Sequence, residues 1–329
     1  MRHARETLVT GGAGFVGSAF LSRLANRDGY SILATYHSRK PQVVAANIRY
    51  VQTDLRDPST CHKITENIDT VYAFSGRLST TAIMAQNPLG PITENVVIHT
   101  NMLEAAYKNG VSKYLWLSST TGYPETESPA KEGQFFELDP PPPYEPVGLT
   151  SRFLEKLSEL YVKKAKHAFS VIALQPTSIF GYGDDFNFES CHALPALIRR
   201  VIERRNPIEI WGSGEDGRDY LYVEDLVDAC LLAVENTNGF EAFNIGSGKI
   251  HTLNQLLSII LELDSFNEAT ILRKLDQKRP VTVRQFDCEK AKNLLGFSTK
   301  TPVEVGLAKT LKWFRENQSL ISDSKGRST

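Results

Sequence analysis

A glycine-rich stretch close to the N-terminus has the spacing of a turn that binds phosphate groups. Residues 10–17 read TGGAGFVG, with a glycine at every third position from 11 to 17, between a short apolar run and a helix-like segment. Glycines let a backbone turn tightly and approach a pyrophosphate, and the free N–H groups of a helix start attract its charge. The context favours a dinucleotide site over a plain strand-to-helix turn. The residues predicted to bind the dinucleotide here are Gly11, Gly14, Phe15, Val16 and Gly17.

The end of the second predicted strand bears on which dinucleotide binds. An acidic residue there would hold the ribose 2′-hydroxyl of NAD, but the sequence reads TYHSRK. Ser38 and Arg39 suit a 2′-phosphate, by hydrogen bond and by charge, which favours NADP and leaves NAD as the alternative. A solvated basic loop would have the same composition. Asp54, after the third predicted strand, is placed to accept a hydrogen bond from an adenine amino group.

The elements that must position these residues alternate along the first half of the chain. Short apolar runs are separated by segments of helical period near 15–27, 92–109 and 149–166, the pattern of parallel strands joined by crossover helices. Six strands with these helices predict a doubly wound, Rossmann-type sheet. The proline run at 139–143 cannot continue a helix and predicts a surface loop. The predicted strands are TLVTG, SILATY, IRYVQT, DTVYAFSG, KYLWLSS and SVIALQP.

The pattern loosens after Pro176. A loop rich in Gly, Asp and Asn leads to a helix near 193–205, and the strand-like pieces IEIWG, DYLYV and AFNIGSG alternate with further helices. We therefore predict an α/β fold in which a dinucleotide-binding domain, 1–175, precedes a smaller α/β substrate lobe, 176–320, whose chain crosses back to the sheet. Residues 321–329 are predicted to form a polar tail.

Composition and charge exclude several classes of partner. The chain of 329 residues is 41% hydrophobic and 23% charged, with a formal net charge of −1, which is typical of a globular protein and attracts neither nucleic acid nor an anionic membrane. The four cysteines form no CxxC pair, so neither a metal site nor a disulfide framework is predicted. No hydrophobic leader precedes the first strand and no run reaches the length of a membrane span, so we expect a cytoplasmic location.

Longer motifs carry a resemblance that covers nearly the whole chain. The sequence resembles the extended short-chain dehydrogenase/reductases of the nucleotide-sugar epimerase/dehydratase group in TGGAGFVG, the Asp54–Leu55 pair, TNMLEAAYKNGVSKYLWLSST, LQPTSIFGYGD, WGSGEDGRDYLYVEDLVDA and FNIGSGK. PTSIFGYGDDFNFESCHALPALIRR and GLAKTLKWFRENQ are similar to the GDP-L-fucose synthases of that group. The resemblance implies an NAD(P) cofactor contacted also by Leu55, a nucleotide-sugar substrate with a GDP-sugar favoured, and a homodimer paired through helices 92–109 and 149–166.

The resemblance also locates the redox site, and there the chain departs from the pattern. In that family a Ser or Thr orients the sugar oxygen, a tyrosine exchanges the hydroxyl proton during hydride transfer, and a lysine lowers the pKa of the tyrosine. Ser119 matches the serine, but Val147 and Ser151 stand where the tyrosine and lysine belong. Valine cannot transfer a proton. We therefore expect ordinary alcohol–ketone hydride exchange to be disabled, while cofactor and sugar binding are retained.

Neighbouring side chains are candidates for the missing groups. Tyr144 or Tyr123 could act as a relocated acid, although Tyr144 lies in the proline loop, which would have to fold back into the cleft. Arg152 adjoins the lysine position, but one residue on a helix means about 100° of rotation, so it should point elsewhere. Lys156 lies one turn further on. Asn101 matches the helix asparagine of the family, which supports the catalytic helix through its backbone.

A second acid–base pair is implied by the likeness to the GDP-L-fucose synthases, which also epimerise their keto-sugar with a Cys/His pair. His192 matches the histidine, and Thr121 falls where the cysteine would be. Threonine is a poor base, so this pair too is expected to be weakened. A hydrogen-bonded structural histidine is the alternative.

The substrate lobe needs cations that hold a diphosphate, preferably arginine. Arg200, in PALIRR, and Arg218, in GSGEDGRDYLYV, stand where the family contacts it, and Trp211 could border the base. The alternative is that Arg199 and Arg200 form a solvated helix face and that Trp211 belongs to the core.

Three functions follow from these residues. The first is an NAD(P)-binding epimerase or reductase of nucleotide sugars with an atypical redox site. The second is a catalytically silent regulatory protein that binds the cofactor or the sugar nucleotide. The third is a keto-sugar epimerase that uses His192 without net hydride transfer.

Overall fold

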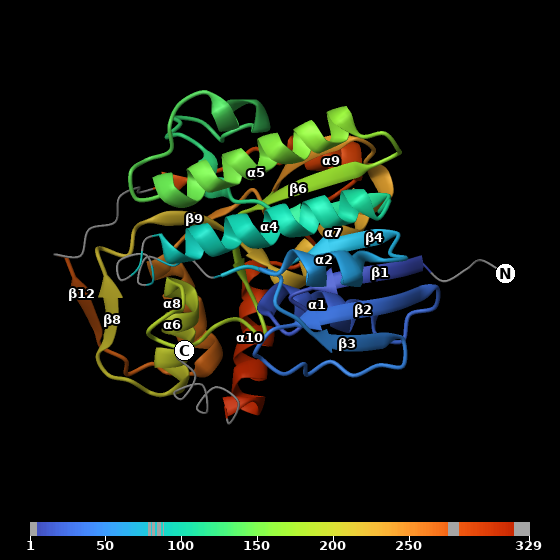
Figure 1. Cartoon of the computed structure of the whole chain (residues 1–329). Coiled ribbons are helices and arrows are strands. Elements are labelled where there is room, and N and C mark those ends of the chain that lie inside the picture. The colour runs from blue at the N-terminus through green and yellow to red at the C-terminus, as the bar shows by residue number, and fades with distance from the viewer. Residues whose placement is uncertain are drawn as a thin grey trace.

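A seven-stranded parallel sheet forms the centre of the molecule (Figure 1). The computed structural model describes residues 5–77, 80, 83, 87, 89–275 and 283–318. The sheet consists of β1 (Arg5–Thr10), β2 (Tyr30–Tyr36), β3 (Ile48–Gln52), β4 (Thr70–Ala73), β5 (Lys113–Leu117), β6 (Ser170–Pro176) and β10 (Phe240–Ile245). Their spatial order is β10-β6-β5-β4-β1-β2-β3, and each neighbouring pair is parallel. This is the predicted Rossmann-type fold.

Helices cover both faces of the sheet, as its apolar strands require. Strands buried on both faces are apolar along their whole length rather than at alternate positions, and β4 is buried at every position. One core cluster joins the sheet to α1, α7 and α9, and another joins it to α2, α4 and α5; Figure 1 shows α4 and α5 side by side over the second face. The bounds are α1 Phe15–Leu24, α2 Pro58–Thr65, α4 Gly90–Lys108, α5 Glu145–Lys164, α7 Val223–Asn236 and α9 Glu289–Leu295.

The seventh strand corrects the sequence-based count of six. The piece AFNIGSG, predicted among the strands of the second half, contributes to β10, which pairs with β6 from Phe240 opposite Val171 to Ile245 opposite Pro176. Without β10, the edge of β6 would present unpaired N–H and C=O groups. Local sequence patterns cannot show to which sheet a short strand adds, because pairing depends on contacts distant in the chain.

A smaller lobe with its own core lies beside the sheet, at the left in Figure 1. In it β9 pairs with β7, β11 and β13, and β8 pairs with β12. Phe180, Leu197, Ile260 and Leu307 are among the side chains that form its core. The elements are β7 (Ser178–Phe180), α6 (Ala193–Ile202), β8 (Ile208–Trp211), β9 (Gly217–Tyr222), β11 (Ile250–Thr252), α8 (Leu253–Asp264), β12 (Ile271–Lys274), β13 (Val283–Arg284) and α10 (Val303–Glu316).

Most predicted helices form with shifted ends. The helix predicted at 149–166 begins already at Glu145, because Pro146 is tolerated in the first turn of a helix, where its missing N–H is not needed. The predicted tail, 321–329, lies outside the described residues. Within the described part of the chain, no helix is long and apolar enough to span a bilayer.

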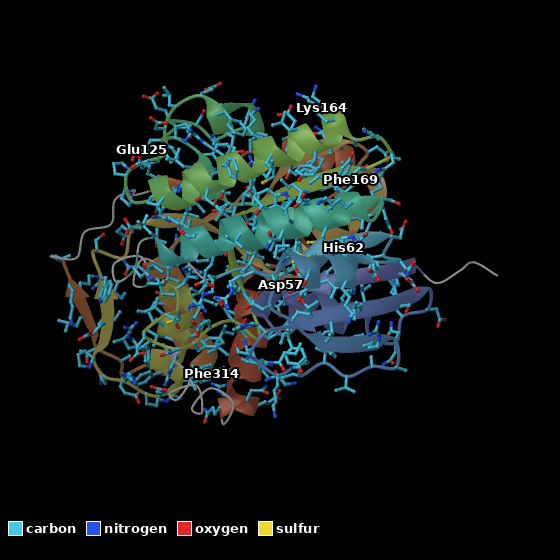
Figure 2. The ribbon with its side chains drawn as sticks, in the orientation of Figure 1. Asp57, His62, Glu125, Lys164, Phe169 and Phe314 are labelled. Atoms are coloured by element: carbon cyan, nitrogen blue, oxygen red, sulfur yellow. The ribbon has the colours of Figure 1, made fainter. Side chains whose placement is uncertain are left out.

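Side-chain caps mark the start of two helices. Asp57, labelled in Figure 2, accepts the N–H groups of Ser59 and Thr60, each at 3.1 Å, and so begins α2. At α8 the Thr252 hydroxyl accepts the Gln255 N–H at 3.2 Å, while the Gln255 side chain accepts the Thr252 N–H at 2.9 Å. The start of α1 has no such cap, and this difference matters for the site below.

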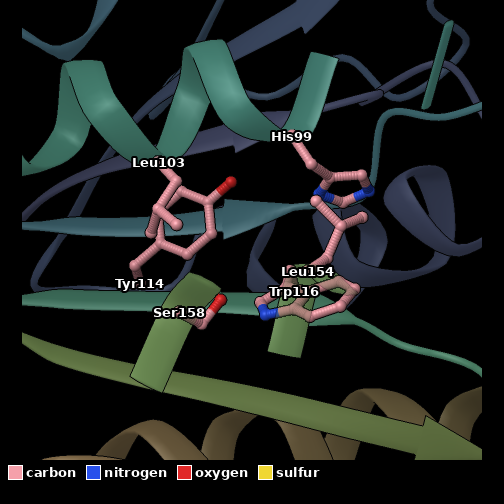
Figure 3. A pocket seen from close by; sticks show the side chains of 6 residues that line it. All are labelled: His99, Leu103, Tyr114, Trp116, Leu154 and Ser158. Carbon is pink, nitrogen blue, oxygen red and sulfur yellow. The ribbon is translucent and has the colours of Figure 1, made fainter. Parts of the chain in front are cut away.

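A small internal cavity lies between α4, α5 and β5 (Figure 3). Its volume of about 10 Å³ suits about one water molecule, far less than a nucleotide needs. Burial lowers the pKa of the His99 imidazole to about 4, so this ring is neutral at pH 7. The cavity is therefore a packing feature of the core. Its lining residues are His99, Leu103, Tyr114, Trp116, Leu154 and Ser158.

Candidate active site

The glycine turn between β1 and α1 leaves no room for side chains at its closest points. Gly11 has φ +68°, in the left-handed region, and its carbonyl accepts the Gly14 N–H at 2.8 Å. A β-carbon on Gly17 would lie 2.1 Å from the Gly11 oxygen, which no contact permits. Because Gly14 offers no side-chain cap, the first N–H groups of α1 are available to an anion. The turn therefore fits a dinucleotide pyrophosphate, as the spacing predicts.

The end of β2 presents basic and hydroxyl side chains to solvent beside this turn. The Gly12 N–H donates to the Thr35 carbonyl at 2.7 Å, and the Gly11 N–H donates to the Thr35 hydroxyl at 3.3 Å. Ser38 and Arg39 follow directly after β2 and are exposed. Arg39 forms no ion pair with a described carboxylate, so its charge is available to a ligand phosphate.

We expect Arg39→Ala to weaken NADP(H) binding about 10- to 100-fold, the equivalent of a charge-assisted hydrogen bond of about 1.5–3 kcal/mol, while NAD(H) binding changes little. Calorimetric titration with each dinucleotide measures the ratio. Arg49→Ala, which removes an exposed arginine from β3, is the matched control. Equal losses for both dinucleotides would contradict a role for Arg39 in recognition of the 2′-phosphate.

The Asp54 carboxylate is held by its own neighbour. Arg56 donates to it through Nε at 2.9 Å and Nη2 at 2.7 Å, and this hydrogen-bonded guanidinium lowers the pKa of Asp54 to about 2. Leu55 is buried below it. Asn101 donates from Nδ2 to the carbonyls of Leu55 at 3.2 Å and Arg56 at 3.0 Å. The Asn101 side chain therefore holds the loop after β3, and support of the catalytic helix through its backbone stays a prediction.

Two hydroxyls lie together where β5 ends. Ser119 caps the 3-10 turn Thr120–Gly122, and its Oγ is 2.8 Å from the Oγ1 of Thr121. The first turn of α5 packs directly on this segment, since a β-carbon on Gly148 would lie 2.7 Å from the Thr121 carbonyl oxygen. Ser119 and Thr121 thus form one hydroxyl pair beside the first turn of α5.

Val147 and Ser151, which stand on α5 at the family's tyrosine and lysine positions, supply no acid or base. Ser151 is buried, and its hydroxyl donates to the Val147 carbonyl at 3.0 Å within the helix. A hydroxyl bonded to its own helix backbone provides neither the charge nor the reach of a lysine. Valine presents only methyl groups.

The structure distinguishes among the side chains proposed to replace the missing tyrosine and lysine. Tyr123 is fully buried, its hydroxyl lies 2.8 Å from Gln175 Oε1 and 2.9 Å from Asn244 Oδ1, and burial strongly raises its pKa. Tyr123 is therefore a core residue, and its candidacy as an acid is wrong. Arg152 donates from Nε to the Gly122 carbonyl at 2.9 Å, which confirms that it points away from the lysine position. Lys156 forms an ion pair with Glu159, on the same helix, at 3.1 Å.

Tyr144 behaves differently, because it caps α5 instead of lying in a loop that must fold back. The guanidinium carbon of Arg284 lies 4.5 Å from the centroid of its ring, and Arg284 Nη2 donates to the Thr120 carbonyl at 2.6 Å. Sequence reasoning missed Arg284. Its place depends on the pairing of β13 with β9, which sets Arg284 opposite Arg218, and a two-residue strand leaves no detectable sequence pattern.

A buried carboxyl group lies behind this cluster. Glu155, on α5, contacts the Ser118 hydroxyl and accepts the Gln175 Nε2–H at 2.8 Å. Burial raises its pKa to about 7, against the opposing effect of these hydrogen bonds. Gln175 in turn meets the Tyr123 hydroxyl, so a continuous polar chain runs from the end of β5 into the core.

Glu155 should make stability fall as pH rises. The folded chain holds its proton more tightly than the unfolded chain, so the contribution is full below about pH 4.5 and is lost as pH rises through about 7. Relative to Glu155→Gln, which mimics the neutral acid, the natural chain is expected to lose on the order of 1–3 kcal/mol of unfolding free energy across this window. Urea titrations at a series of pH values measure it. Glu145→Gln, exposed on the same helix, serves as control, and a pH-independent difference would refute the assignment.

His192 begins α6 at the end of a folded loop. The residue as a whole is exposed, but desolvation of its imidazole lowers the pKa of the ring and Asp185 opposes the shift, so a neutral ring prevails at pH 7. Burial also raises the pKa of Asp184 to about 8, and its Oδ2 has no partner in the described part of the chain. This loop reaches the first turn of α1, since a β-carbon on Gly183 would lie 3.6 Å from the Ser18 hydroxyl.

The arginine cluster of α6 leaves one cation without a carboxylate. The guanidinium carbons of Arg199, Arg200 and Arg205 lie 4.4, 5.2 and 4.4 Å from the centroid of the Phe188 ring. Glu203 pairs with Arg199 at 2.7 Å and with Arg205 at 2.8 Å. Arg200 forms no ion pair within the described residues. Because Arg199 is buried, the alternative of a solvated helix face is wrong for it.

The other two predicted substrate contacts lie on strands of the smaller lobe. Trp211, at the end of β8, is 50% exposed, so its assignment to the core is wrong. Arg218, on β9, donates from Nη1 to the Gly217 carbonyl at 2.7 Å. Next to it, the Asp219 carboxylate accepts the N–H groups of Ser247 and Gly248, both at 2.9 Å, and so orders the glycine loop after β10.

Comparison with known proteins agrees with this architecture. The chain matches the NAD dependent epimerase/dehydratase family over residues 7–246. It is 28% identical over 325 residues to a putative GDP-L-fucose synthase 2 of Arabidopsis thaliana. The alignment covers 96% of this chain and 94% of that protein. It is 27% identical over 333 residues to the GDP-L-fucose synthase of Escherichia coli K12, with 95% and 98% coverage.

Solved structures extend the likeness to the whole fold. UDP-glucose 4-epimerase from Thermotoga maritima, solved with UDP-glucose, superposes with a TM-score of 0.83 at 26% identity and covers 95% of this chain and 99% of that one. MoeE5, solved with UDP-glucose and NAD, gives a TM-score of 0.81 at 26% identity. The superposition covers 95% of this chain and 99% of that one. These findings confirm the resemblance seen in the sequence motifs. The chain belongs to the NAD dependent epimerase/dehydratase family and has the fold of its nucleotide-sugar enzymes.

Proposed function

We propose that this protein reduces a keto-sugar carried on a nucleoside diphosphate, with a GDP-sugar favoured and NADPH preferred to NADH. The observation that carries the proposal is the uncapped glycine turn of a chain that belongs to this family, with exposed Ser38 and Arg39 beside it. The relatives that are GDP-L-fucose synthases support the choice of GDP. When bound, the reduced dinucleotide supplies the hydride for the carbonyl carbon.

Residues of the chain itself would bind the dinucleotide, bind the substrate and orient the sugar oxygen. The N–H groups at the start of α1 hold the pyrophosphate, and Arg200 and Arg218 hold the substrate diphosphate in the smaller lobe. Exposed Trp211 provides a surface for the base. The hydroxyls of Ser119 and Thr121 orient the sugar oxygen. Since Val147 and Ser151 handle no proton, the redox site is atypical, and reduction here requires a proton donor other than the one at the family's tyrosine position.

A keto-sugar epimerase is the second candidate, favoured by the neutral imidazole of His192. A neutral imidazole can accept a proton from a carbon next to the carbonyl group, and a second donor such as water then protonates the opposite face, with no net hydride transfer. Incubation with a GDP-4-keto-6-deoxyhexose in deuterium oxide tests this reaction. Deuterium at C3 or C5 of the sugar, lost in His192→Asn, would support it.

The reductase proposal is tested with the same sugar and NADPH. Oxidation of NADPH, followed by absorbance and matched by formation of a GDP-6-deoxyhexose, is the expected result. Binding of both ligands in calorimetry without turnover would instead identify a silent binding protein. Absence of affinity for either dinucleotide would overturn the proposal as a whole.

We also propose that the protein forms a homodimer through α5. Leu149, Phe153 and Leu160 lie on one face of α5 and are 44%, 52% and 53% exposed. A helix face this apolar is typical of an interface. Phe153→Glu is therefore expected to convert the dimer into a monomer in light scattering, whereas Lys163→Glu at the polar end of α5 should not. A monomeric natural chain would contradict the proposal.

A further inference from the structure

Tyr144 occupies the face of α5 on which the family carries its tyrosine, one turn earlier. It is the N-cap of α5, its N–H donates to the Pro141 carbonyl at 2.8 Å, and its own carbonyl accepts the Gly148 N–H at 2.8 Å. Residues three apart on a helix share a face, so Tyr144 and Val147 lie one above the other. Helical side chains lean toward the N-terminus, which carries the Tyr144 ring beyond the helix end.

The same face of α5 meets the hydroxyl pair at the end of β5. Gly148, one turn after Tyr144, is in van der Waals contact with the Thr121 carbonyl, and a side chain at 148 would collide with it. The Thr121 and Ser119 hydroxyls lie 2.8 Å apart in this segment. Tyr144 is therefore a titratable side chain at the start of α5, next to the segment that carries the proposed sugar-oxygen site.

Arg284 ties Tyr144 to that segment from the other lobe. Its guanidinium carbon is 4.5 Å from the centroid of the Tyr144 ring, and its Nη2 donates to the Thr120 carbonyl at 2.6 Å. It forms no ion pair with a described carboxylate, and its register partner on β9 is another cation, Arg218. A partly buried guanidinium that forms no ion pair, with only the more distant charge of Glu125 to favour it, is costly, so a role toward an anion that appears during the reaction explains its position. Burial lowers the pKa of Arg284, and the neighbouring Tyr144 opposes the shift.

We infer that Tyr144 is the proton donor of this site and that Arg284 is the positioning cation that stabilises its phenolate. The inference rests on the proposed reductase function. As hydride reaches the carbonyl carbon, the O–H bond of Tyr144 breaks and a new O–H bond forms on the sugar oxygen. The phenolate then faces the Arg284 guanidinium until water returns a proton, so one NADPH and one proton are consumed per alcohol formed.

Tyr144→Phe is expected to lower kcat by on the order of 10²–10⁴ with KM for the keto-sugar little changed, because general acid catalysis is lost while binding is kept. Tyr161→Phe, on the far end of the same helix, is the matched control and should keep full activity. Dinucleotide affinity measured by calorimetry should be the same in both variants, which separates loss of chemistry from loss of fold.

Arg284 is tested by two substitutions. Arg284→Met is expected to lower kcat about 10- to 100-fold and to move the alkaline limb of the pH–rate profile, because the phenolate loses its neighbouring charge. Arg284→Lys should restore most of kcat and the natural profile. If Arg284→Met instead raised KM alone, the residue would hold the substrate diphosphate and its assignment beside Tyr144 would be overturned.

A structural measurement gives a readout that does not depend on turnover. In crystals of the protein with NADP⁺ and GDP-mannose, we expect the Tyr144 hydroxyl at hydrogen-bonding distance, roughly 2.6–3.2 Å, from the sugar O4. A hydroxyl directed away from the sugar would overturn the inference, as would full activity in Tyr144→Phe. Those two results leave the reductase function standing. Absence of dinucleotide binding, or binding without turnover in the natural chain, would reject the reductase function and the inference together.

Discussion

A Gly17→Ala substitution is expected to weaken dinucleotide binding about 10- to 100-fold. The added methyl group would lie 2.1 Å from the Gly11 oxygen, so the turn must open and its N–H groups move away from the pyrophosphate. Forcing extra volume into a closely packed site costs about 1–3 kcal/mol, and each 1.4 kcal/mol changes affinity about tenfold. Titration with NADPH, followed by its fluorescence, measures the loss.

Gly133→Ala is the control for this substitution, since a β-carbon there meets no atom within 4 Å. Thermal unfolding of both variants shows whether the fold survives. Natural affinity in a folded Gly17→Ala protein would mean that the dinucleotide does not bind at this turn, and the cofactor assignment would fail with it.

Adding the family's tyrosine and lysine to a Tyr144→Phe chain is expected to raise kcat by on the order of 10²–10⁴. Val147→Tyr supplies a proton donor at the family's tyrosine position, and Ser151→Lys supplies the positive charge that favours its phenolate. The background removes Tyr144, so that the new pair alone is measured. Initial rates of NADPH oxidation with a GDP-4-keto-6-deoxyhexose give the result.

The single substitutions, each in the Tyr144→Phe background, are the controls. Val147→Tyr alone should recover part of the rate, and Ser151→Lys alone should recover none, because a lysine without a phenol has no proton donor to assist. A triple variant that binds both ligands and remains inactive would show that the site differs from that of the family in more than these side chains.

The sequence by itself determined the parts of this protein that depend on local rules. The TGGAGFVG turn could be predicted because its glycines are required by contacts between residues a few positions apart, such as Gly17 with Gly11. The apolar runs of β1 to β6 could be predicted for a related reason, since strands covered on both faces are apolar throughout. The absence of the tyrosine and lysine was also visible, because the resemblance of EPVGLTSRFLEKL to the family's motif places Val147 and Ser151 at their positions.

The tertiary structure alone decided which of the remaining polar residues lie near the candidate site. From the sequence, Tyr123 and Tyr144 are equally plausible proton donors. In the structure the Tyr123 hydroxyl contacts the buried side chains of Gln175 and Asn244, whereas Tyr144 begins α5 beside Arg284. Arg284 is 164 positions from the Thr120 carbonyl that it contacts. β10 likewise reaches β6 from the second half of the chain. Such contacts arise from the packing of whole elements, and no local pattern of residues encodes them.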